Sequence, residues 1–452
     1  MSSPNKRPRV EADLAAAVAA AAPSEDDAAE PPLHERKPES YTSARRALRL
    51  QFIRADGDES EEYEPEFVHQ IFDEESIEYP SDAAPLAIKV RYSLATLDLC
   101  YEANVPIEGA AEAALYTLAG ALPTPVADTT ALRERASSAF APEIAGECLV
   151  RECNARGGED GGGVSPPCAI YCSTLAGAPP ARLAFHERLQ SLFRWAIETA
   201  DPIDAADDRW RLFTMWRRCG DLMELVAACT VFRFQRWIPK EGPRPLLRVC
   251  QVVVLPPFRG QGHGSRLLQA IYDHAKAEGC LDVTVEDPND AFRLVRDLTD
   301  LRSCLQASLM RPADMCSAPT PEQLAKARKV LPVTEDQLHR CFEVQQYQML
   351  LDELARLRAA GATAHEEEAA TKPFRLSLKK RINKANKEEL DAMLSLQAVS
   401  ADKDEGATLP SAEDAPSREQ LVAARKARLE ELYQEQISEY AECARRVAKK
   451  VC

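Results

Sequence analysis

Three glycines at alternate positions mark the segment LPPFRGQGHGSRLL, which runs from Leu255 to Leu268. Because glycine has no side chain, the backbone N–H groups from about Gly260 to Ser265 can converge on one point. The apolar spacing that follows predicts a helix, whose N-terminal end carries partial positive charge. Arg259 can add a full charge. These features favour a pyrophosphate-binding loop; the alternative is a glycine-rich turn that only joins a strand to a helix.

The spacing of the loop separates three kinds of phosphate-binding motif. A P-loop ends in Gly-Lys-Ser/Thr, whereas here Gly264 is followed by Ser265 and Arg266, so the phosphate-bridging lysine is missing. A dinucleotide fingerprint needs G-x-G-x-x-G directly after a strand, and here two prolines intervene. The third pattern, Arg/Gln-x-x-Gly-x-Gly/Ala, is filled in register by Arg259, Gly262 and Gly264. The residues predicted to contact phosphate are Arg259, Gly260, Gln261, Gly262, His263, Gly264 and Ser265.

The elements on either side must position this loop. Three β-rich segments with short connections precede it, a helix is expected from about Gly262, and a short strand and a further helix follow. A run of antiparallel-looking strands therefore leads into a strand–loop–helix–strand unit, which is typical of an α+β layered domain. The segments are residues 209–219, 224–234 and 244–255 for the first strands, 281–288 for the short strand and 290–304 for the last helix.

Composition divides the chain into four regions. Residues 1–42 are rich in Ala, Pro and acids and are predicted to be a disordered tail, in which NKRPRV is a candidate nuclear import signal. Residues 43–165 are expected to form an N-terminal α+β domain that ends in a flexible loop, residues 156–167, and residues 166–305 the α+β layered domain that holds the glycine loop. Residues 306–452 are helical, with a basic segment and a final helix that opens on a capping-box pattern, Ser417 to Gln420. Its apolar stripe favours packing within the chain over a partner helix, and comprises Val422, Leu429, Tyr433, Ile437, Tyr440, Ala444 and Val447.

Charge and hydropathy restrict the class of protein. The 452 residues carry a formal net charge of −16, and 45% of them are apolar. An acidic surface repels nucleic-acid phosphate and favours basic partners. No apolar run approaches the ~18 residues that a membrane span needs, and no secretory signal is visible. We expect a protein of the nucleus and cytoplasm that binds neither nucleic acid nor membrane directly.

The fourteen cysteines lack the rhythm of a disulfide scaffold. Cys148 and Cys153 are five positions apart, which places them on opposite faces of a strand, and Cys168 and Cys172 have no CxxC mate at zinc spacing. The sequence therefore predicts reduced thiols and no metal.

The stretch VVVLPPFRGQGHGSRLL (residues 252–268) resembles the acetyl-CoA-binding motif of the GNAT acetyltransferase superfamily. Together with LDVTVEDPNDAF (residues 281–292), it looks closer still to the type B histone acetyltransferases. The resemblance covers most of residues 60–450, through EFVHQIF, the helix around residues 185–204, DDRW and FRLSLKKR. The Ala-rich N-terminus, the insertion PKEGPRPLLR, Arg259 where Gln is common and Ala291 where Ser is common depart from the family.

The resemblance implies a GNAT core, with a mixed, mostly antiparallel sheet flanked by helices, that transfers acetyl from acetyl-CoA to a lysine. A free lysine has a pKa of ~10.4, so a base beside the amine helps the attack. The matching position for that general base is Glu286, with Asp287 and Glu198 as auxiliary acids. The backbone of Val252, Val253 and Val254 is expected to pair with the pantetheine arm, with an N–H near Val254 facing the oxyanion.

The resemblance also implies a substrate and partners. It implies the tail of newly made histone four as acceptor, and a β-propeller histone chaperone as partner. The residues carried over as histone-binding are Asp73, Glu74, Glu75, Trp210, Phe232, Arg233 and Phe234. Two alternatives stay open: a GNAT enzyme for another protein or a polyamine, and a scaffold that binds CoA and histone without turnover, against which Glu286 argues.

Overall fold

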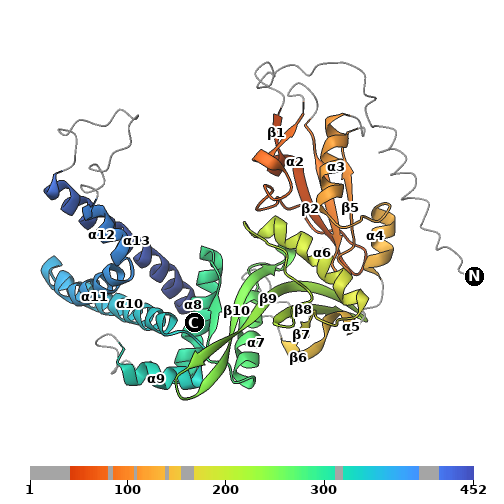
Figure 1. The fold of residues 1–452 in the computed structure, drawn as a ribbon. Helices are drawn as coiled ribbons and strands as arrows, with labels where there is room; N and C mark the ends of the chain where they lie inside the picture. Colours follow the sequence, from red (N-terminus) through yellow and green to blue (C-terminus); the bar gives the residue numbers. More distant parts are fainter. Residues whose placement is uncertain are drawn as a thin grey trace, which may run out of the picture. The chain divides into compact units, whose positions relative to one another are not determined.

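The structure is a computed structural model that describes residues 41–79, 85–105, 109–137, 142–153, 167–310, 319–395 and 417–451. The basic import motif and most of the glycine-rich loop at residues 156–167 lie outside the described residues. The chain divides into two compact units: one holds the residues up to Arg233 together with Val249–Leu267, and the other holds Phe234–Arg248 and Leu268–Cys452. The α+β class is confirmed, since both units combine strands and helices (Figure 1).

A small mixed sheet opens the first unit. Strand β2 (Leu48–Ile53) pairs in parallel with β4 (Ile88–Ser93), and β4 pairs antiparallel with β5 (Leu99–Ala103). Phe52 and Tyr92 stack across it with ring centroids 6.3 Å apart. The first strand begins inside the segment expected to be a tail. The other elements here are β1 (Tyr41–Ser43), α2 (Ala44–Ala47), the 3-10 turn η2 (Asp73–Glu75), β3 (Ser76–Glu78), α3 (Ala110–Ala121), α4 (Thr129–Ala136) and α5 (Pro142–Ala145).

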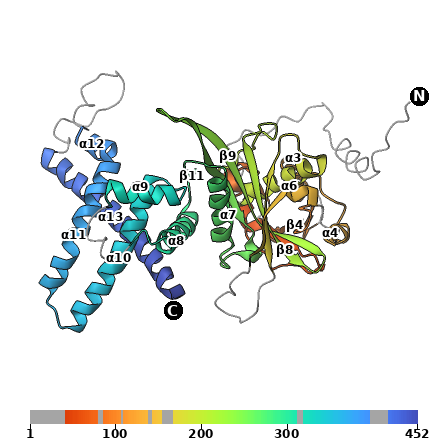
Figure 2. The same ribbon diagram turned by 90° about the horizontal axis from the view of Figure 1, so that it is seen from below.

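A six-stranded sheet carries the candidate site, in the order β11-β10-β9-β8-β7-β6. The strands from β6 to β9 pair antiparallel with their neighbours, and the strands expected from the sequence are confirmed. Helix α6 (Pro180–Ala196) is labelled in Figure 2. It buries Phe185, Leu189, Leu192 and Phe193 along one face. The strands are β6 (Glu147–Cys153), β7 (Cys168–Thr174), β8 (Trp210–Cys219), β9 (Leu222–Ile238), β10 (Gly242–Val254) and β11 (Val283–Val285), and α7 (His263–Ala277) follows β10.

A buried carboxylate joins the two sheets of the first unit. Glu224 is 1% exposed, and one of its oxygens accepts the backbone N–H of Ala55 at 2.9 Å. Its other oxygen accepts from the guanidinium of Arg217 on β8. The Leu225 N–H also donates to the Leu94 carbonyl at 2.7 Å. The small sheet is therefore bound to the large one by charge-assisted and backbone hydrogen bonds.

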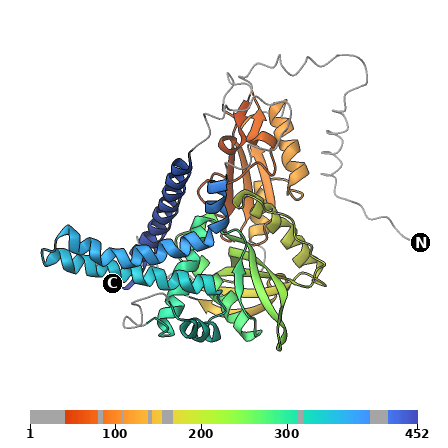
Figure 3. The ribbon, with the colours of Figure 1, turned by 60° about the vertical axis from the view of Figure 1, so that its left-hand side comes forward.

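The second unit is mainly helical, and the described part of residues 306–452 has the helical character expected of it. Helices α10 (Glu335–Ala359) and α11 (Ala364–Ala385) lie side by side, and α13 (Arg418–Val451) packs on both (Figure 3). The capping box is confirmed, because the Gln420 N–H donates to Ser417 Oγ and the Gln420 side chain accepts the Ser417 N–H. The remaining helices are α8 (Asp290–Gln306), α9 (Pro321–Val330) and α12 (Lys387–Ser395).

The apolar stripe of α13 packs within the chain, as predicted, but its first member is wrong. Val422 is 37% exposed, whereas the preceding Leu421 is 6% exposed. Tyr433, Tyr440 and Ala444 are buried as expected. Because an α-helix has 3.6 residues per turn, a stripe traced at whole-residue spacing over about seven turns drifts around the helix. At its N-terminal end the buried position is therefore Leu421, one residue before the predicted Val422.

Candidate active site

The end of β10 has the alternation of a strand with one covered face. Val253 is buried, while Val252 and Val254 are half-buried. The Leu255 N–H donates to the Val226 carbonyl at 3.0 Å, so β9 holds the chain at the residue that follows the strand. Within the first unit, the strand leads directly into the glycine loop through a short 3-10 turn, Pro256–Phe258.

The glycine loop owes its composition to backbone conformation. Gly260 and Gly262 both have φ of +76°, a region that residues with a Cβ rarely adopt. A Cβ on Gly262 would lie 3.7 Å from Arg266 Nη1, which is ordinary contact, so packing alone does not require glycine there. Helix α7 begins at His263, and Gly264 and Ser265 lie in its first turn. The N–H groups of that turn have no partner inside the helix, which is the feature of an anion-binding terminus.

The side chains of Arg266 and His263 support the loop. Arg266 Nη2 donates to the Gln261 carbonyl at 2.8 Å and lies 3.0 Å from His263 Nδ1. Burial, together with the positive charges of Arg266 and Arg217, lowers the pKa of His263 to about 4. The His263 ring is therefore neutral near pH 7 and accepts from Arg266 through Nδ1. It supports the loop and carries no charge toward a phosphate.

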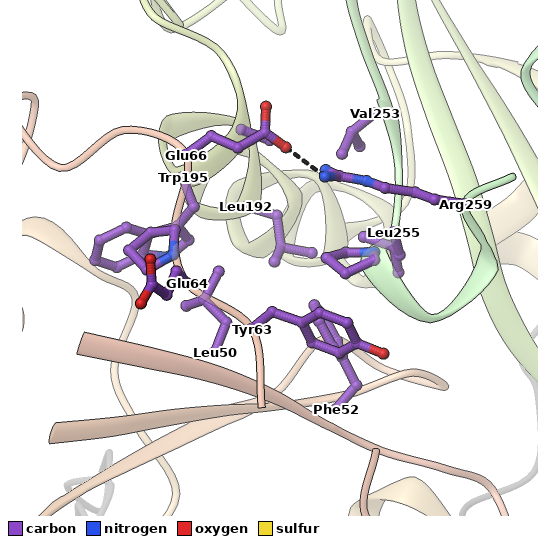
Figure 4. A pocket seen from close by; sticks show the side chains of 13 residues that line it. Leu50, Phe52, Tyr63, Glu64, Glu66, Leu192, Trp195, Val253, Leu255 and Arg259 are labelled. Carbon is purple, nitrogen blue, oxygen red and sulfur yellow. Dashed lines mark ion pairs between the residues drawn. The ribbon is translucent and has the colours of Figure 1, made fainter. Parts of the chain in front are cut away.

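Arg259 is directed away from the role expected of it. Its Nε donates to the Val254 carbonyl at 3.0 Å, and its Nη1 lies 2.5 Å from Glu66 Oε1 (Figure 4). The pair lies at a pocket of about 110 Å³ beside the end of β10. The lining is mostly apolar and comprises Leu50, Phe52, Tyr63, Glu64, Pro65, Glu66, Leu192, Trp195, Ala196, Val253, Leu255, Pro256 and Arg259. A phosphate contact from Arg259 would therefore compete with Glu66.

Glu286 and Asp287 follow β11 in the second unit. The carboxylate of Glu286 is about half exposed and lies 3.7 Å from Arg248 Nη1. Asp287 has a φ of +32°, so the chain turns sharply between the strand and Pro288. The Val283 N–H, at the start of β11, donates to the Pro332 carbonyl at 2.7 Å. This hydrogen bond holds the start of the strand, while Glu286 and Asp287 are exposed beyond its end.

Phe234 shares a partner with Glu286. The Arg248 guanidinium carbon lies 4.6 Å from the centroid of the Phe234 ring, and the same guanidinium approaches Glu286. A residue expected to contact histone and the expected base are thus joined within the second unit by one arginine.

Trp210 and Phe232 form a cross-strand pair in the first unit. They are register partners on β8 and β9, and their rings meet edge to face at 4.8 Å. Arg209 stacks on Phe232 at 4.6 Å, and the Arg233 N–H donates to the Arg209 carbonyl at 3.0 Å. The structure therefore brings together three of the residues expected at the acceptor side.

The acidic segment Asp73–Glu75 forms the short turn η2. Asp73 and Glu75 are exposed. Glu75 has a φ of +53°, and its carboxylate lies 3.8 Å from His69 Nδ1. This turn presents carboxylates to solvent, as a charged binding surface requires and as an ordinary surface turn also does.

Glu198 lies in the turn that follows α6, two residues past the end of the helix. Its side chain is exposed, and its carbonyl accepts from the Gln70 side chain at 2.9 Å. Glu198 belongs to the first unit, with the glycine loop, and Glu286 belongs to the second.

Two protein-family profiles match the chain, and together they cover residues 40–293. The profile of the Acetyltransferase (GNAT) family matches residues 183–293, which include the glycine loop and Glu286. The profile described as Histone acetyl transferase HAT1 N-terminus matches residues 40–198. The chain thus resembles the type B histone acetyltransferases.

Curated members of this family resemble the chain over part of its length. Each of three is a histone acetyltransferase type B catalytic subunit. The Schizosaccharomyces pombe subunit is 31% identical over 47% of this chain and 51% of its own length. The Rattus norvegicus subunit is 25% identical over 59% and 58%, and the Homo sapiens subunit 28% over 35% and 38%. The matched part of the chain thus spans between 38% and 58% of the length of these curated relatives.

Among solved structures, an aminoglycoside acetyltransferase from an uncultured soil metagenomic sample has 15% identity and a TM-score of 0.22 over 28% of this chain, too small a likeness to carry an argument. Within the described residues, no three His, Cys, Asp or Glu side chains gather as a metal site requires. None of the helices in the described ranges is long and apolar enough to cross a membrane.

Four polar residues at the site escaped the sequence analysis. Arg248 touches Glu286, Arg266 braces the loop, and Gln70 and Gln251 hold the turn of Glu198. Arg266 carries a local signal, since it lies one turn into the helix behind three glycines. The other three have no local signal, because their partners are distant in the sequence.

Proposed function

We propose that the protein is a histone lysine acetyltransferase of type B, which transfers acetyl from acetyl-CoA to free, newly synthesised histones. The observation that carries the proposal is the glycine loop with two positive-φ glycines at the start of α7, in a chain that resembles catalytic subunits of type B histone acetyltransferases. The N–H groups from Gly260 to Ser265 would receive the pyrophosphate. The backbone of Val252–Val254 would pair with the pantetheine arm.

Glu286 would act as the general base. A lysine ammonium must lose a proton before its nitrogen can attack. In this proposal Glu286 takes that proton, the lysine nitrogen forms a bond to the thioester carbonyl carbon, and the carbon–sulfur bond breaks. The CoA thiolate leaves and is protonated. A backbone N–H near Val254 would stabilise the oxyanion of the tetrahedral intermediate, with Glu198 and Asp287 orienting or relaying protons.

The acceptor in this proposal is the basic tail of histone four. Asp73, Glu74 and Glu75 would attract it, and Trp210 with Phe232–Phe234 would form a wall for its chain. A formal net charge of −16 supports a polycationic partner. The proposal extends to a β-propeller histone chaperone as partner and to action in both nucleus and cytoplasm, where free histones are carried before chromatin assembly.

The test is acetyl transfer from radiolabelled acetyl-CoA to free core histones, to nucleosomes and to spermidine in parallel. Labelling of free histones, with much weaker labelling of nucleosomes, is expected. Glu286→Gln should lower turnover by about 100- to 10,000-fold with unchanged acetyl-CoA affinity, and the loss should shrink at high pH, where more lysine is already neutral. Preferred labelling of spermidine would favour a polyamine enzyme, and binding without labelling would favour a scaffold.

A further inference from the structure

The turn Ile197–Asp201, which carries Glu198, is held by two glutamine side chains from distant segments. We propose that Gln70 and Gln251 are positioning residues that fix this turn and thereby the place of the Glu198 carboxylate. The inference rests on the proposed function, since it concerns the acid that would assist transfer. Neither glutamine needs to touch a substrate.

Gln70 satisfies three backbone groups of the turn. Its Nε2 donates to the Ile197 carbonyl at 2.8 Å and to the Glu198 carbonyl at 2.9 Å. Its Oε1 accepts the Ala200 N–H at 3.2 Å. Only an amide offers two donors and an acceptor at one end of a side chain, so neither Glu nor Met reproduces this set. The pattern also fixes which end of the amide is nitrogen.

Gln251 holds the far end of the turn. Its Nε2 donates to the Asp201 carbonyl at 2.7 Å. Its Oε1 accepts from Thr230 Oγ1 at 3.1 Å, and its own N–H donates to Thr230 Oγ1 at 3.2 Å. The side chain is buried, so this network is fixed in a region of low dielectric. Gln251 immediately precedes Val252, the first residue expected to pair with acetyl-CoA.

The two contacts matter because Glu198 itself is exposed. An exposed carboxylate is not located by packing around its own side chain, so its position depends on the backbone that bears it. Gln70 lies three residues before the acidic turn Asp73–Glu75, and Gln251 lies on β10. The turn of Glu198 is therefore tied, within the first unit, to the segment expected to bind the acceptor and to the strand expected to bind acetyl-CoA.

The experiment compares Gln70→Met with wild type, each with and without Glu198→Gln. Met keeps the length of the side chain and removes all three hydrogen bonds. Because a misplacement of about 1 Å can cost up to about 100-fold in rate, we expect kcat to fall by about 5- to 100-fold, with an unchanged KM for acetyl-CoA. In the Glu198→Gln background the same change should alter kcat by less than about twofold. Gln348→Met is the matched control, since Gln348 bonds only locally, to Asp352 at 3.2 Å.

A second measurement does not depend on activity. The Ala200 N–H donates to Gln70, so hydrogen exchange at Ala200 should quicken by about tenfold in Gln70→Met and not in Gln348→Met. Unchanged exchange would overturn the proposal, and so would an equal loss of kcat in both Glu198 backgrounds. A wild-type protein that acetylates no histone would contradict the proposed function instead, and exchange at Ala200 would still decide whether the amide holds the turn. Gln70→Leu, which also removes all three hydrogen bonds, replaces Gln70→Met if the latter does not fold.

Discussion

Removing the carboxylate of Glu66 should strengthen acetyl-CoA binding. In the structure Arg259 is paired with Glu66 and with the Val254 carbonyl. If the guanidinium is to reach a pyrophosphate at the glycine loop, the ion pair must be given up or shared. Glu66→Gln removes this competition and leaves the length of the side chain unchanged, so Arg259 becomes available to the ligand.

The size of the effect follows from exposure. The side chains of Arg259 and Glu66 are 46% and 38% exposed, and exposed pairs are worth about 0.2–1 kcal/mol. Since about 1.4 kcal/mol is a tenfold change, the Kd for acetyl-CoA should fall by about 1.4- to 5-fold at low salt. At high salt the difference should vanish, because ions screen exposed charges.

Calorimetric titration of acetyl-CoA at two salt concentrations measures this. Glu64→Gln is the matched control, because Glu64 lines the same pocket and pairs with Arg49 at 3.3 Å. In an Arg259→Gln background, Glu66→Gln should leave Kd unchanged. A weaker affinity for Glu66→Gln would refute the reasoning, since the ion pair would then hold the loop in its binding shape. An equal gain in acetyl-CoA affinity for Glu64→Gln would show that the effect comes from the change in net charge and not from the release of Arg259.

Three further changes test other parts of the fold. Gly262→Ala should weaken acetyl-CoA binding by about 5- to 30-fold, because φ of +76° costs a residue with a Cβ roughly 1–2 kcal/mol; calorimetry on folded protein that shows wild-type affinity would contradict this. Arg217→Met should lower the free energy of unfolding in urea by about 3–5 kcal/mol, because the buried Glu224 loses its cation, and a loss below about 1 kcal/mol would contradict it. Burial lowers the pKa of His186 to about 4, below the unfolded value of ~6.5, so this neutral ring contributes stability above pH 6.5 that is lost as pH falls toward 4. In urea unfolding of His186→Gln, the free energy of unfolding should fall less steeply with pH over that window, by a slope equivalent to up to about one bound proton. A slope equal to that of the wild type would exclude His186 as the source of the pH dependence.

Local patterns predicted the elements that carry the site. The start of α7 at His263, the strands β8 to β10 and the capping box of α13 all depend on neighbours within a few residues, so the sequence contains their full signal. The positive φ of Gly262 gives a reason for glycine at this position that the sequence analysis did not contain, beside the expected convergence of backbone N–H groups.

Side-chain partners were beyond such patterns. That Arg259 would meet Glu66, that Arg248 would approach Glu286, and that Gln70 would hold the turn of Glu198 are results of tertiary folding. Arginine and glutamine are common surface residues, so their presence at these positions distinguishes nothing until the chain has folded. The site residues taken from the family resemblance remain predictions for the experiments above.

The hydrogen bond from Ala55 to Glu224 has a consequence for synthesis on the ribosome. The two residues are 169 positions apart, and at about 5–20 residues per second the intervening chain takes roughly 10–30 s to add. During that time the edge of the small sheet that will meet Glu224 has a free N–H group and exposed apolar neighbours. Nascent chains stalled before residue 224 should therefore bind chaperones or aggregate, whereas chains whose strand β9 has emerged from the ribosome should not.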